Sequence, residues 1–96
     1  MNSRQRAYLS SLANSIDPIF QIGKASLTPE IISALDSAIE KRELIKVSVL
    51  KNCADDPREI ASMIAERTRS QVVKVIGKKM IFYREAKKNP QIKLPE

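Results

Sequence analysis

The hydrophobic residues of the chain change their spacing several times, and each change predicts a different element. Between residues 3 and 14 apolar side chains recur at the spacing of a helix face, and Ser3 is a suitable N-cap. Residues 18–22 (PIFQI) predict a short strand, because Pro18 stands at the first position, where a missing N–H is tolerated. The chain is therefore expected to begin with a helix followed by a strand.

Two further helices begin at clear start signals. A Thr-Pro pair at 28–29 predicts an N-cap followed by the first helical residue, and apolar positions continue at helical spacing to about Arg42. An Asp-Pro pair at 56–57 gives the same signal, with Glu59 at the capping-box position, and this helix should end near Arg67. The residues expected to form its core face are Ile60, Met63 and Ile64.

Three later segments show the pattern of strands. Residues 44–50 alternate between apolar and polar side chains, which predicts a half-buried strand with Lys46 on its polar side. Residues 71–76 and 79–84 predict a hairpin, because the Gly-Lys pair at 77–78 suits a two-residue type II′ turn.

The resulting order of elements, α-β-α-β-α-β-β, predicts a two-layer α/β fold. Crossover connections and a terminal hairpin together imply a small four-stranded mixed sheet, and we expect its helices to pack on one face. The open face should carry Lys46 and Lys74, which occupy polar positions of their strands. We expect one domain over residues 1–96, in which residues 85–96, with two prolines and little pattern, form a loosely held basic arm.

The composition narrows the possible functions. The 96 residues include no histidine and one cysteine, Cys53, which excludes a disulfide within the chain, a Cys-based zinc site and every Ser-His or Cys-His pair. The carboxylates form no catalytic pair, and we expect no catalytic residue, metal, cofactor or small-molecule substrate. Asp55 and Asp56 leave a two-carboxylate magnesium site as an alternative, although helix capping explains Asp56. No apolar run approaches the ~20 residues of a membrane span, and the N-terminus does not resemble a secretory signal. We therefore expect a cytoplasmic protein.

Charge is distributed unevenly along the chain. The net charge is +6, but residues 27–66 contain five bases and eight acids, whereas residues 67–96 contain nine bases and two acids. A strongly basic third of a small domain is typical of proteins that bind a polyanion, most often nucleic acid. A solvated, solubilising surface is the alternative explanation of the same charge.

The clearest candidate site is the segment Gly23-Lys24-Ala25-Ser26, between the end of a strand and the start of a helix. The first N–H groups of a helix have no partner inside the helix, and the helix dipole is positive there. Gly23 permits close approach of the backbone and Lys24 adds a mobile charge, so the segment can hold a phosphate. The alternative is that Gly23 only makes a turn while Lys24 is solvated.

A second group of cations lies on or beside the predicted hairpin. Each of these side chains alone could be a solvated surface charge, and they form one site only if they converge on one side. Aromatic residues are scarce, which favours contacts with the nucleic-acid backbone and shape over base stacking. The candidates are Arg67, Arg69, Lys74, Lys78, Lys79 and Arg84, together with Lys46.

Several segments of the chain together resemble a known family. The stretches that carry the resemblance are IFQIGK at 19–24, LT at 27–28, RELIKV at 42–47, VIGK at 75–78 and IFYR at 81–84. Their composition and order resemble the CRM domain, and most closely the stand-alone bacterial YhbY-type proteins, over nearly the whole chain.

This resemblance implies a fold and a function. CRM domains are RNA-binding modules with a fold similar to the C-terminal domain of a bacterial translation initiation factor. The stand-alone bacterial members are associated with precursors of the large ribosomal subunit and are thought to help its assembly. The family has a GxxG loop between its first strand and the next helix, comparable to the loop that clamps the backbone in KH domains. Here Ser26 stands at the second glycine position, where it can still donate a hydrogen bond to a phosphate.

We therefore expect a monomeric RNA-binding protein that binds ribosomal RNA in large-subunit precursors and assists ribosome assembly. Lys24 and its loop would hold phosphates, and the other cations would extend the surface. One alternative is a protein-binding adaptor whose basic face meets an acidic partner. Another is a DNA-binding regulator, although residues 31–40 carry only acids among their charges and so offer no basic recognition helix. An enzyme is the least supported class.

Overall fold

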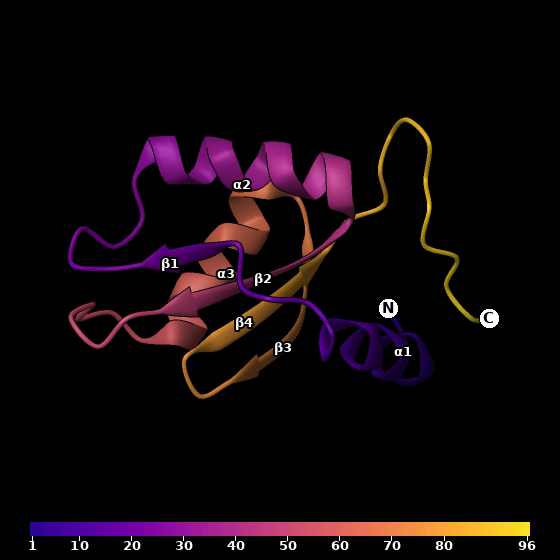
Figure 1. Cartoon of the computed structure of the whole chain (residues 1–96), viewed down its shortest axis with the longest axis horizontal. Coiled ribbons are helices and arrows are strands. Elements are labelled where there is room, and N and C mark those ends of the chain that lie inside the picture. The colour runs from indigo at the N-terminus through magenta and orange to yellow at the C-terminus, as the bar shows by residue number, and fades with distance from the viewer.

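Seven elements follow one another along the chain in the predicted order. The computed structural model describes residues 1–96, which form three helices and one four-stranded mixed sheet (Figure 1). The α/β class and the order of elements are therefore confirmed. None of the three helices has the length and apolar character that crossing a membrane requires. The helices are α1 (Ser3–Ala13), α2 (Pro29–Arg42) and α3 (Pro57–Thr68), and the strands are β1 (Phe20–Ile22), β2 (Leu44–Val49), β3 (Gln71–Ile76) and β4 (Lys79–Tyr83).

Asn2, rather than Ser3, caps α1. The Asn2 Oδ1 atom accepts a hydrogen bond from the Gln5 N–H at 2.8 Å, and the Asn2 N–H donates to Gln5 Oε1 at 3.1 Å. This reciprocal pair is a capping box. The equivalent partner of Ser3 would be Arg6, whose side chain has no acceptor. The predicted cap is therefore wrong by one residue.

The start signals of α2 and α3 are confirmed. Thr28 Oγ1 accepts a hydrogen bond from the Ile31 N–H at 3.2 Å. Asp56 Oδ1 accepts from the Arg58 N–H at 3.0 Å, so its bond goes to the second helical residue rather than to the third, Glu59. Both helices have proline as their first residue, a position at which no intrahelical N–H is needed.

The sheet combines parallel and antiparallel pairing. Its strand order is β1-β2-β4-β3, with β1 parallel to β2 and with β4 antiparallel to both β2 and β3. β1 begins at Phe20 rather than Pro18, although the Ile19 N–H already donates to the β2 backbone at 2.9 Å. In the hairpin turn Gly77 has a φ of +56° whereas Lys78 has a negative φ, which fits the predicted type II′ turn.

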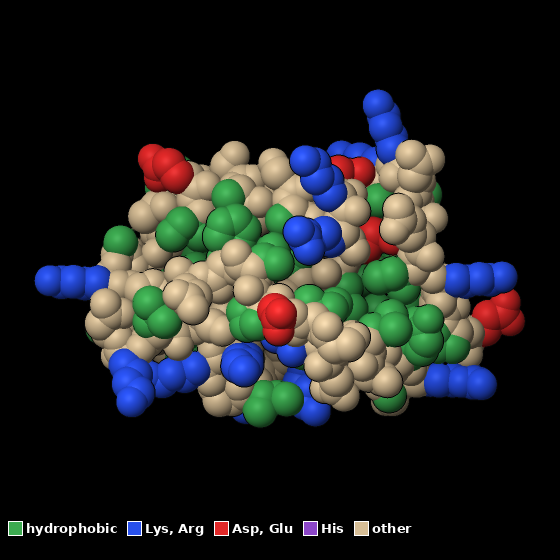
Figure 2. Space-filling view, viewed as in Figure 1, with side chains coloured by type: hydrophobic (Ala, Val, Ile, Leu, Met, Phe, Trp, Pro, Cys, Tyr) green, Lys and Arg blue, Asp and Glu red, His purple; other side chains and the backbone are tan.

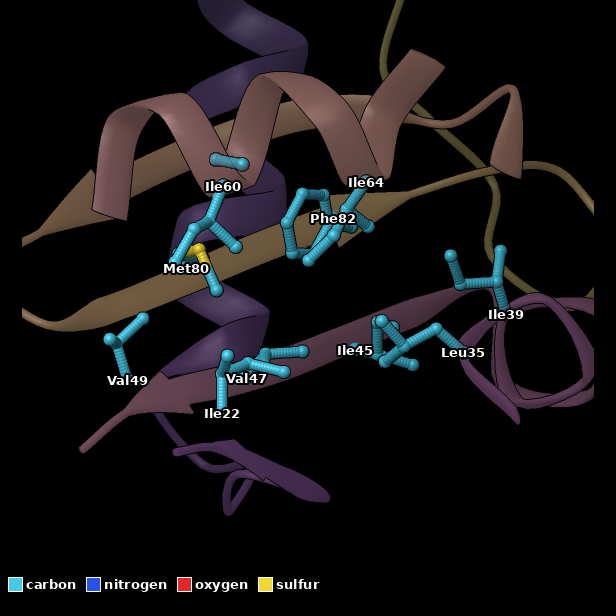
Figure 3. Close-up of a cluster of buried hydrophobic side chains, with 11 residues drawn as sticks. Ile22, Leu35, Ile39, Ile45, Val47, Val49, Ile60, Ile64, Met80 and Phe82 are labelled. Carbon is cyan, nitrogen blue, oxygen red and sulfur yellow. The ribbon is translucent and has the colours of Figure 1, made fainter. Parts of the chain in front are cut away.

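One face of the sheet packs against α2 and α3. Figure 3 shows Met80 and Phe82 of β4 beneath Ile60 and Ile64 of α3. Burial of this apolar surface is the main favourable contribution to folding. The buried members of this main core are Ile22, Leu35, Ile39, Ile45, Val47, Val49, Ile60, Ala61, Ile64, Met80 and Phe82.

Met63 does not belong to the main core, which corrects the predicted core face of α3. Its side chain is 45% exposed, whereas Ala61 is buried. The residues that α3 buries are Ile60, Ala61, Ile64 and Thr68, so the helix is rotated away from Met63.

α1 packs on the opposite face of the sheet. Its Leu9 and Ala13 belong to a second buried cluster that contains Leu44, Ile81 and Tyr83. The expectation that the helices lie on one face holds for α2 and α3 but not for α1 (Figure 1). The physical reason is β4, whose run MIFY is apolar at every position and is buried throughout, as in a strand covered on both faces.

The C-terminal segment, residues 85–96, has no regular secondary structure but is tied to the rest of the domain. The Glu43 carboxylate accepts three backbone hydrogen bonds, from the N–H groups of Ala86 (2.8 Å), Gln91 (2.7 Å) and Ile92 (2.8 Å). We call this set of bonds the Glu43 clasp. It differs from the expected loosely held arm because one buried carboxylate between α2 and β2 satisfies three of the segment's donors.

Candidate nucleic-acid interface

Three loops meet at one end of the sheet. The Leu50 N–H donates to the Ile22 carbonyl oxygen at 2.8 Å, and the Val49 N–H donates to the Lys78 carbonyl oxygen at 2.7 Å. These bonds bring together the loop after β1 and the loop after β2, at the left of Figure 1, and the β3–β4 turn at its lower edge. We call this surface the loop end, and it comprises residues 23–26, 50–55 and 77–78.

The predicted phosphate-binding segment at 23–26 is a tight turn. The Ser26 N–H donates to the Gly23 carbonyl oxygen at 2.9 Å, as in a β-turn. Ser26 has a φ of +55°, in the left-handed region that glycine adopts without strain. Ser26 therefore occupies the second glycine position of the GxxG pattern at a conformational cost of about 1–2 kcal/mol.

Gly23 is not required for the conformation of this turn. Its φ is not positive, unlike that of Gly77. A Cβ atom at Gly23 would lie 3.5 Å from the nearest side-chain atoms of Leu50 and Asn52, which is ordinary van der Waals contact. The fold would therefore accept alanine at this position. What the glycine provides is a bare Cα that another molecule can approach closely.

Near the start of α2, the backbone N–H groups that have no protein acceptor lie mainly in the turn at 23–26 rather than in the helix itself. The N–H groups of Lys24 and Ala25 donate to no protein acceptor. The start of α2 offers less, because Pro29 has no N–H, the cap side chain occupies a further N–H, and Glu30 places a carboxylate in the first turn. An anion at this corner would therefore meet the turn and Lys24 rather than the helix dipole alone.

Exposed lysines surround the loop end. Lys24 and Lys78 are both exposed, as predicted for a surface that meets a polyanion, and so is Lys51, which the sequence analysis did not single out. Figure 2 shows Lys and Arg side chains at the left end and along the lower edge of this face, and others at its upper right and right end. Strand pairing is the signal that identifies Lys51, because residues that follow the carboxyl ends of neighbouring parallel strands meet at one edge.

The sheet face that α2 and α3 leave uncovered carries three lysines around one isoleucine. Lys46 of β2 and Lys74 of β3 are both register partners of Ile81 in β4, and Lys79 stands two residues before Ile81. All three side chains therefore project from one face, and Lys79 directly follows the turn of the loop end. We call Lys46, Lys74 and Lys79 the sheet lysines. Neither α1 nor any strand contains an acidic residue.

Arg84 is engaged in contacts inside the domain. Its Nη1 atom donates to Asp36 Oδ1 at 2.6 Å and to the Thr68 carbonyl oxygen at 2.5 Å, and Nη2 lies 3.4 Å from Glu40 Oε1. The Arg84 side chain is only 17% exposed. It joins the end of β4 to α2 and to the C-terminus of α3. We therefore leave Arg84 out of the interface that we propose below.

Arg67 and Arg69 lie apart from the sheet lysines. They line an open depression of about 650 Å³ on the side formed by α2 and α3. Lys87 and Lys88 line the same depression, together with Asp36 and Glu40, whose carboxylates are paired with Arg84. The structure thus divides the predicted cations by position, into one group at the loop end and sheet face and another group on the side of α2 and α3.

The titratable groups whose pKa values are shifted lie away from the loop end. Burial by itself raises the pKa of the Glu43 carboxyl, but the three backbone donors of the Glu43 clasp outweigh burial and hold the pKa below its ordinary value. Burial also raises the pKa of Tyr83, and the negative charges of Glu43 and Glu85 add to this effect. Both pKa shifts therefore occur in groups that lie where the C-terminal segment is anchored.

The fold and the charge pattern define a class of protein: a small α/β domain with a cationic end and an acid-free sheet. A family model for the CRS1/YhbY (CRM) domain matches residues 1–84. The chain belongs to this family. The resemblance inferred from the sequence is therefore confirmed.

Similar proteins match the chain over nearly its whole length. It is 42% identical over 95 residues to "Probable RNA-binding protein YqeI" of Bacillus subtilis, covering 99% of each chain. It is 27% identical over 95 residues to a protein of Haemophilus influenzae named "RNA-binding protein", covering 99% of this chain and 95% of that one. The solution structure of the hypothetical protein SAV1595 from Staphylococcus aureus is 49% identical, with a TM-score of 0.83 and 99% of each chain covered.

Proposed function

We propose that this protein binds RNA through the loop end and the sheet lysines. The observation that carries the proposal is the arrangement of Lys24, Lys51 and Lys78 in loops that meet beside a turn with unpaired backbone N–H groups. Lysine ammonium groups and free N–H groups are the donors that phosphates accept from. The names of two relatives, both described as RNA-binding proteins, support the same conclusion.

The target that we propose is ribosomal RNA in precursors of the large subunit, whose assembly the protein would assist. The support for this target is the resemblance to the stand-alone YhbY-type members of the family. We further propose that it acts in the cytoplasm as a monomer and as a single domain over residues 1–96, without a metal, cofactor or catalytic step.

Crosslinking of RNA to the protein in cells, followed by sequencing of the bound RNA, tests the proposed target. We expect large-subunit ribosomal RNA and its precursors to be enriched. A bound population dominated by messenger RNA would contradict the ribosomal target while leaving RNA binding itself intact.

Single substitutions at the loop end test the proposed interface. Lys24→Ala and Lys78→Ala should each weaken binding of a labelled fragment of large-subunit ribosomal RNA. Each should also reduce the slope of log affinity against log salt by about 0.7–0.9, because one phosphate contact is lost. Filter binding at several salt concentrations measures both quantities.

Lys41→Ala is the matched control for these substitutions. Lys41 is exposed and lies in the last turn of α2, at the opposite end of that helix from the loop end. It should bind RNA with nearly the affinity and salt slope of the unchanged protein. Affinities and slopes that do not differ among Lys24→Ala, Lys78→Ala and Lys41→Ala would reject the interface.

A further inference from the structure

A groove lies between α1 and the β3–β4 hairpin, on the face of the sheet that carries the sheet lysines. Its volume is about 540 Å³. Its floor is apolar and includes Val73 and Ile81, which are 1% and 6% exposed. Lys74 and Ile76 form the β3 side, and Ile76 is 55% exposed. The α1 side presents mostly small side chains, from Ser3, Arg6, Ala7, Ser10, Ser11 and Asn14.

Arg6 and a β-bulge hold α1 in place beside β3. The register between β3 and β4 shifts between Val72 and Lys74, so Val73 is the extra residue of the bulge. Arg6 Nη1 donates to the carbonyl oxygens of Val72 and Val73, both at 2.7 Å. Because these bonds and the buried residues of α1 fix the helix against the strand, the groove is part of the packed structure.

A straight row of side chains leads from the loop end to this groove. Gln21 of β1 pairs with Ser48 of β2, and Ser48 pairs with Lys79 of β4. Lys79 pairs in turn with Ile76 of β3, at the wall of the groove. The row crosses three strand spacings of about 4.8 Å, roughly 14 Å in total. It contains no acid and begins two residues before Gly23.

We infer that the groove receives a nucleobase of a single-stranded RNA segment whose backbone crosses the sheet along this row. The inference rests on the proposed function, to which it adds the kind of RNA and a second contact site. The exposed side chains of Ile76 and Ala7, above the closed apolar floor, provide the surface that would meet the face of a base. Ser10 and Asn14 provide hydroxyl and amide groups for its edge, and Lys74 is available to the adjacent phosphate.

The groove fits an unpaired base better than a duplex. The bases of an A-form helix are stacked inside it, so its outer surface presents mainly phosphates and 2′-hydroxyls. Such groups could bond to Ser10 or Asn14, but they would leave the apolar surface of Ile76 and Ala7 without a partner, whereas the face of an unpaired base would cover it. Tyr8, although 40% exposed on α1, does not line the groove, so the contact uses aliphatic side chains in place of an aromatic ring.

Two substitutions that change the groove but not the charge of the protein test the inference. Ala7→Phe introduces a large side chain from an exposed position of α1, and Ile76→Ser removes the apolar wall. Fluorescence anisotropy compares binding of a labelled single-stranded oligoribonucleotide of mixed sequence with binding of an RNA duplex of the same length. We expect each variant to bind the single strand about five- to tenfold more weakly, with duplex binding and salt slope unchanged.

The control and the possible outcomes separate this inference from the proposed function. Tyr8→Ala removes an exposed aromatic ring of α1 outside the groove and should bind like the unchanged protein. If Ala7→Phe and Ile76→Ser unfold at the normal temperature and bind the single strand normally, the groove assignment is overturned even if Lys24→Ala weakens binding. Equal losses for single strand and duplex would also overturn it. If the unchanged protein binds neither RNA, the proposed function itself fails.

Discussion

At the scale of single residues, the turn at 23–26 has its glycine and its positive φ at opposite ends. Ser26 has a φ of +55°, whereas Gly23 has no positive φ and has room for a Cβ atom. Conformation alone would place the glycine at position 26. The need of a ligand to reach the backbone would explain a glycine at position 23, because a bare Cα leaves the N–H groups of Lys24 and Ala25 open to that ligand.

Gly23→Ala should therefore reduce RNA binding more than stability. We expect the free energy of unfolding to change by less than about 0.5 kcal/mol, because the added methyl group meets only ordinary contacts. RNA affinity should fall about tenfold, because in the proposed interface the methyl group would crowd the approach of the RNA backbone to the turn. Urea denaturation and filter binding measure the two effects.

Gly77→Ala is the control for this substitution. Gly77 has a φ of +56° with open space around it, so alanine there is strained and should destabilise the protein by about 1 kcal/mol. If Gly23→Ala costs as much stability as Gly77→Ala and leaves RNA affinity unchanged, the access argument is wrong.

At the scale of elements, Glu43 explains how a segment without a helix or strand acquires a fixed place. The residue ends α2 with a φ of +66°, and its carbonyl oxygen accepts the Arg84 N–H at 2.9 Å. Its side chain forms the Glu43 clasp, and the whole residue is 1% exposed. The end of α2, the end of β4 and the C-terminal segment therefore share one anchoring residue.

Glu43→Gln should weaken the C-terminal anchor. The amide keeps one oxygen acceptor, but its NH₂ group faces a backbone donor, so at least one charge-assisted bond is lost. We expect a loss of about 2–3 kcal/mol in the free energy of unfolding, measured by urea denaturation. Glu85→Gln, at an exposed carboxylate without such bonds, should leave stability nearly unchanged. Equal effects of the two substitutions would contradict the anchoring role.

The same carboxylate makes the anchor depend on pH. The folded pKa of Glu43 lies below its ordinary value of about 4.5, so the stabilisation is complete above that value and is lost as pH falls toward the folded pKa. In NMR spectra the amide resonances of Ala86, Gln91 and Ile92 should shift together on acidification below about pH 4.5. The Glu43→Gln variant should not show this shared transition.

Local signals in the sequence predicted most elements of the fold but few of the contacts between them. α2 and α3 begin at Thr-Pro and Asp-Pro pairs, and the hairpin turns at Gly77, because capping and turn chemistry act between near neighbours. The Glu43 clasp joins residues 43, 48 and 49 positions apart, so no short pattern shows it. The face that α1 covers depends likewise on distant strands.

The sequence likewise predicted the local features of the candidate site but not the features that depend on tertiary contacts. The turn at 23–26 is readable from its residues, and strand alternation placed Lys46 and Lys74 on one face. Lys51 required the pairing of β1 with β2, and the internal contacts of Arg84 required the placement of α2 and the end of α3 beside the residue that follows β4. Both facts follow from tertiary structure, which the charge of a single residue does not reveal.

At the scale of the whole molecule, charge is separated between layers. The acids of the regular elements all lie in α2 and α3, whereas α1 and the sheet carry bases alone. In the proposed interface a polyanion would therefore meet the sheet side and the loop end, where the regular elements carry no acid.

The position of the cations should therefore matter more than their number. The double variants Lys24→Ala/Lys78→Ala and Arg67→Ala/Arg69→Ala each remove two charges from a net charge of +6. Only the first should lower RNA affinity tenfold or more, because the arginines lie outside the proposed interface, on the side of α2 and α3. Filter binding at one salt concentration compares them directly. Equal losses would mean that only the total charge attracts RNA.

The hydrogen bonds from Arg6 to β3 hinder the addition of a foreign strand to the edge of the sheet when many copies of the protein lie close together. β3 is an outer strand, and a foreign strand could extend the sheet by pairing with its free backbone groups. Arg6 occupies two of those carbonyl oxygens, the bulge interrupts their regular spacing, and the other outer strand, β1, is only three residues long. Many copies gathered along one RNA would therefore find no continuous template for strand addition, and a high local concentration would not drive them into fibrous polymers.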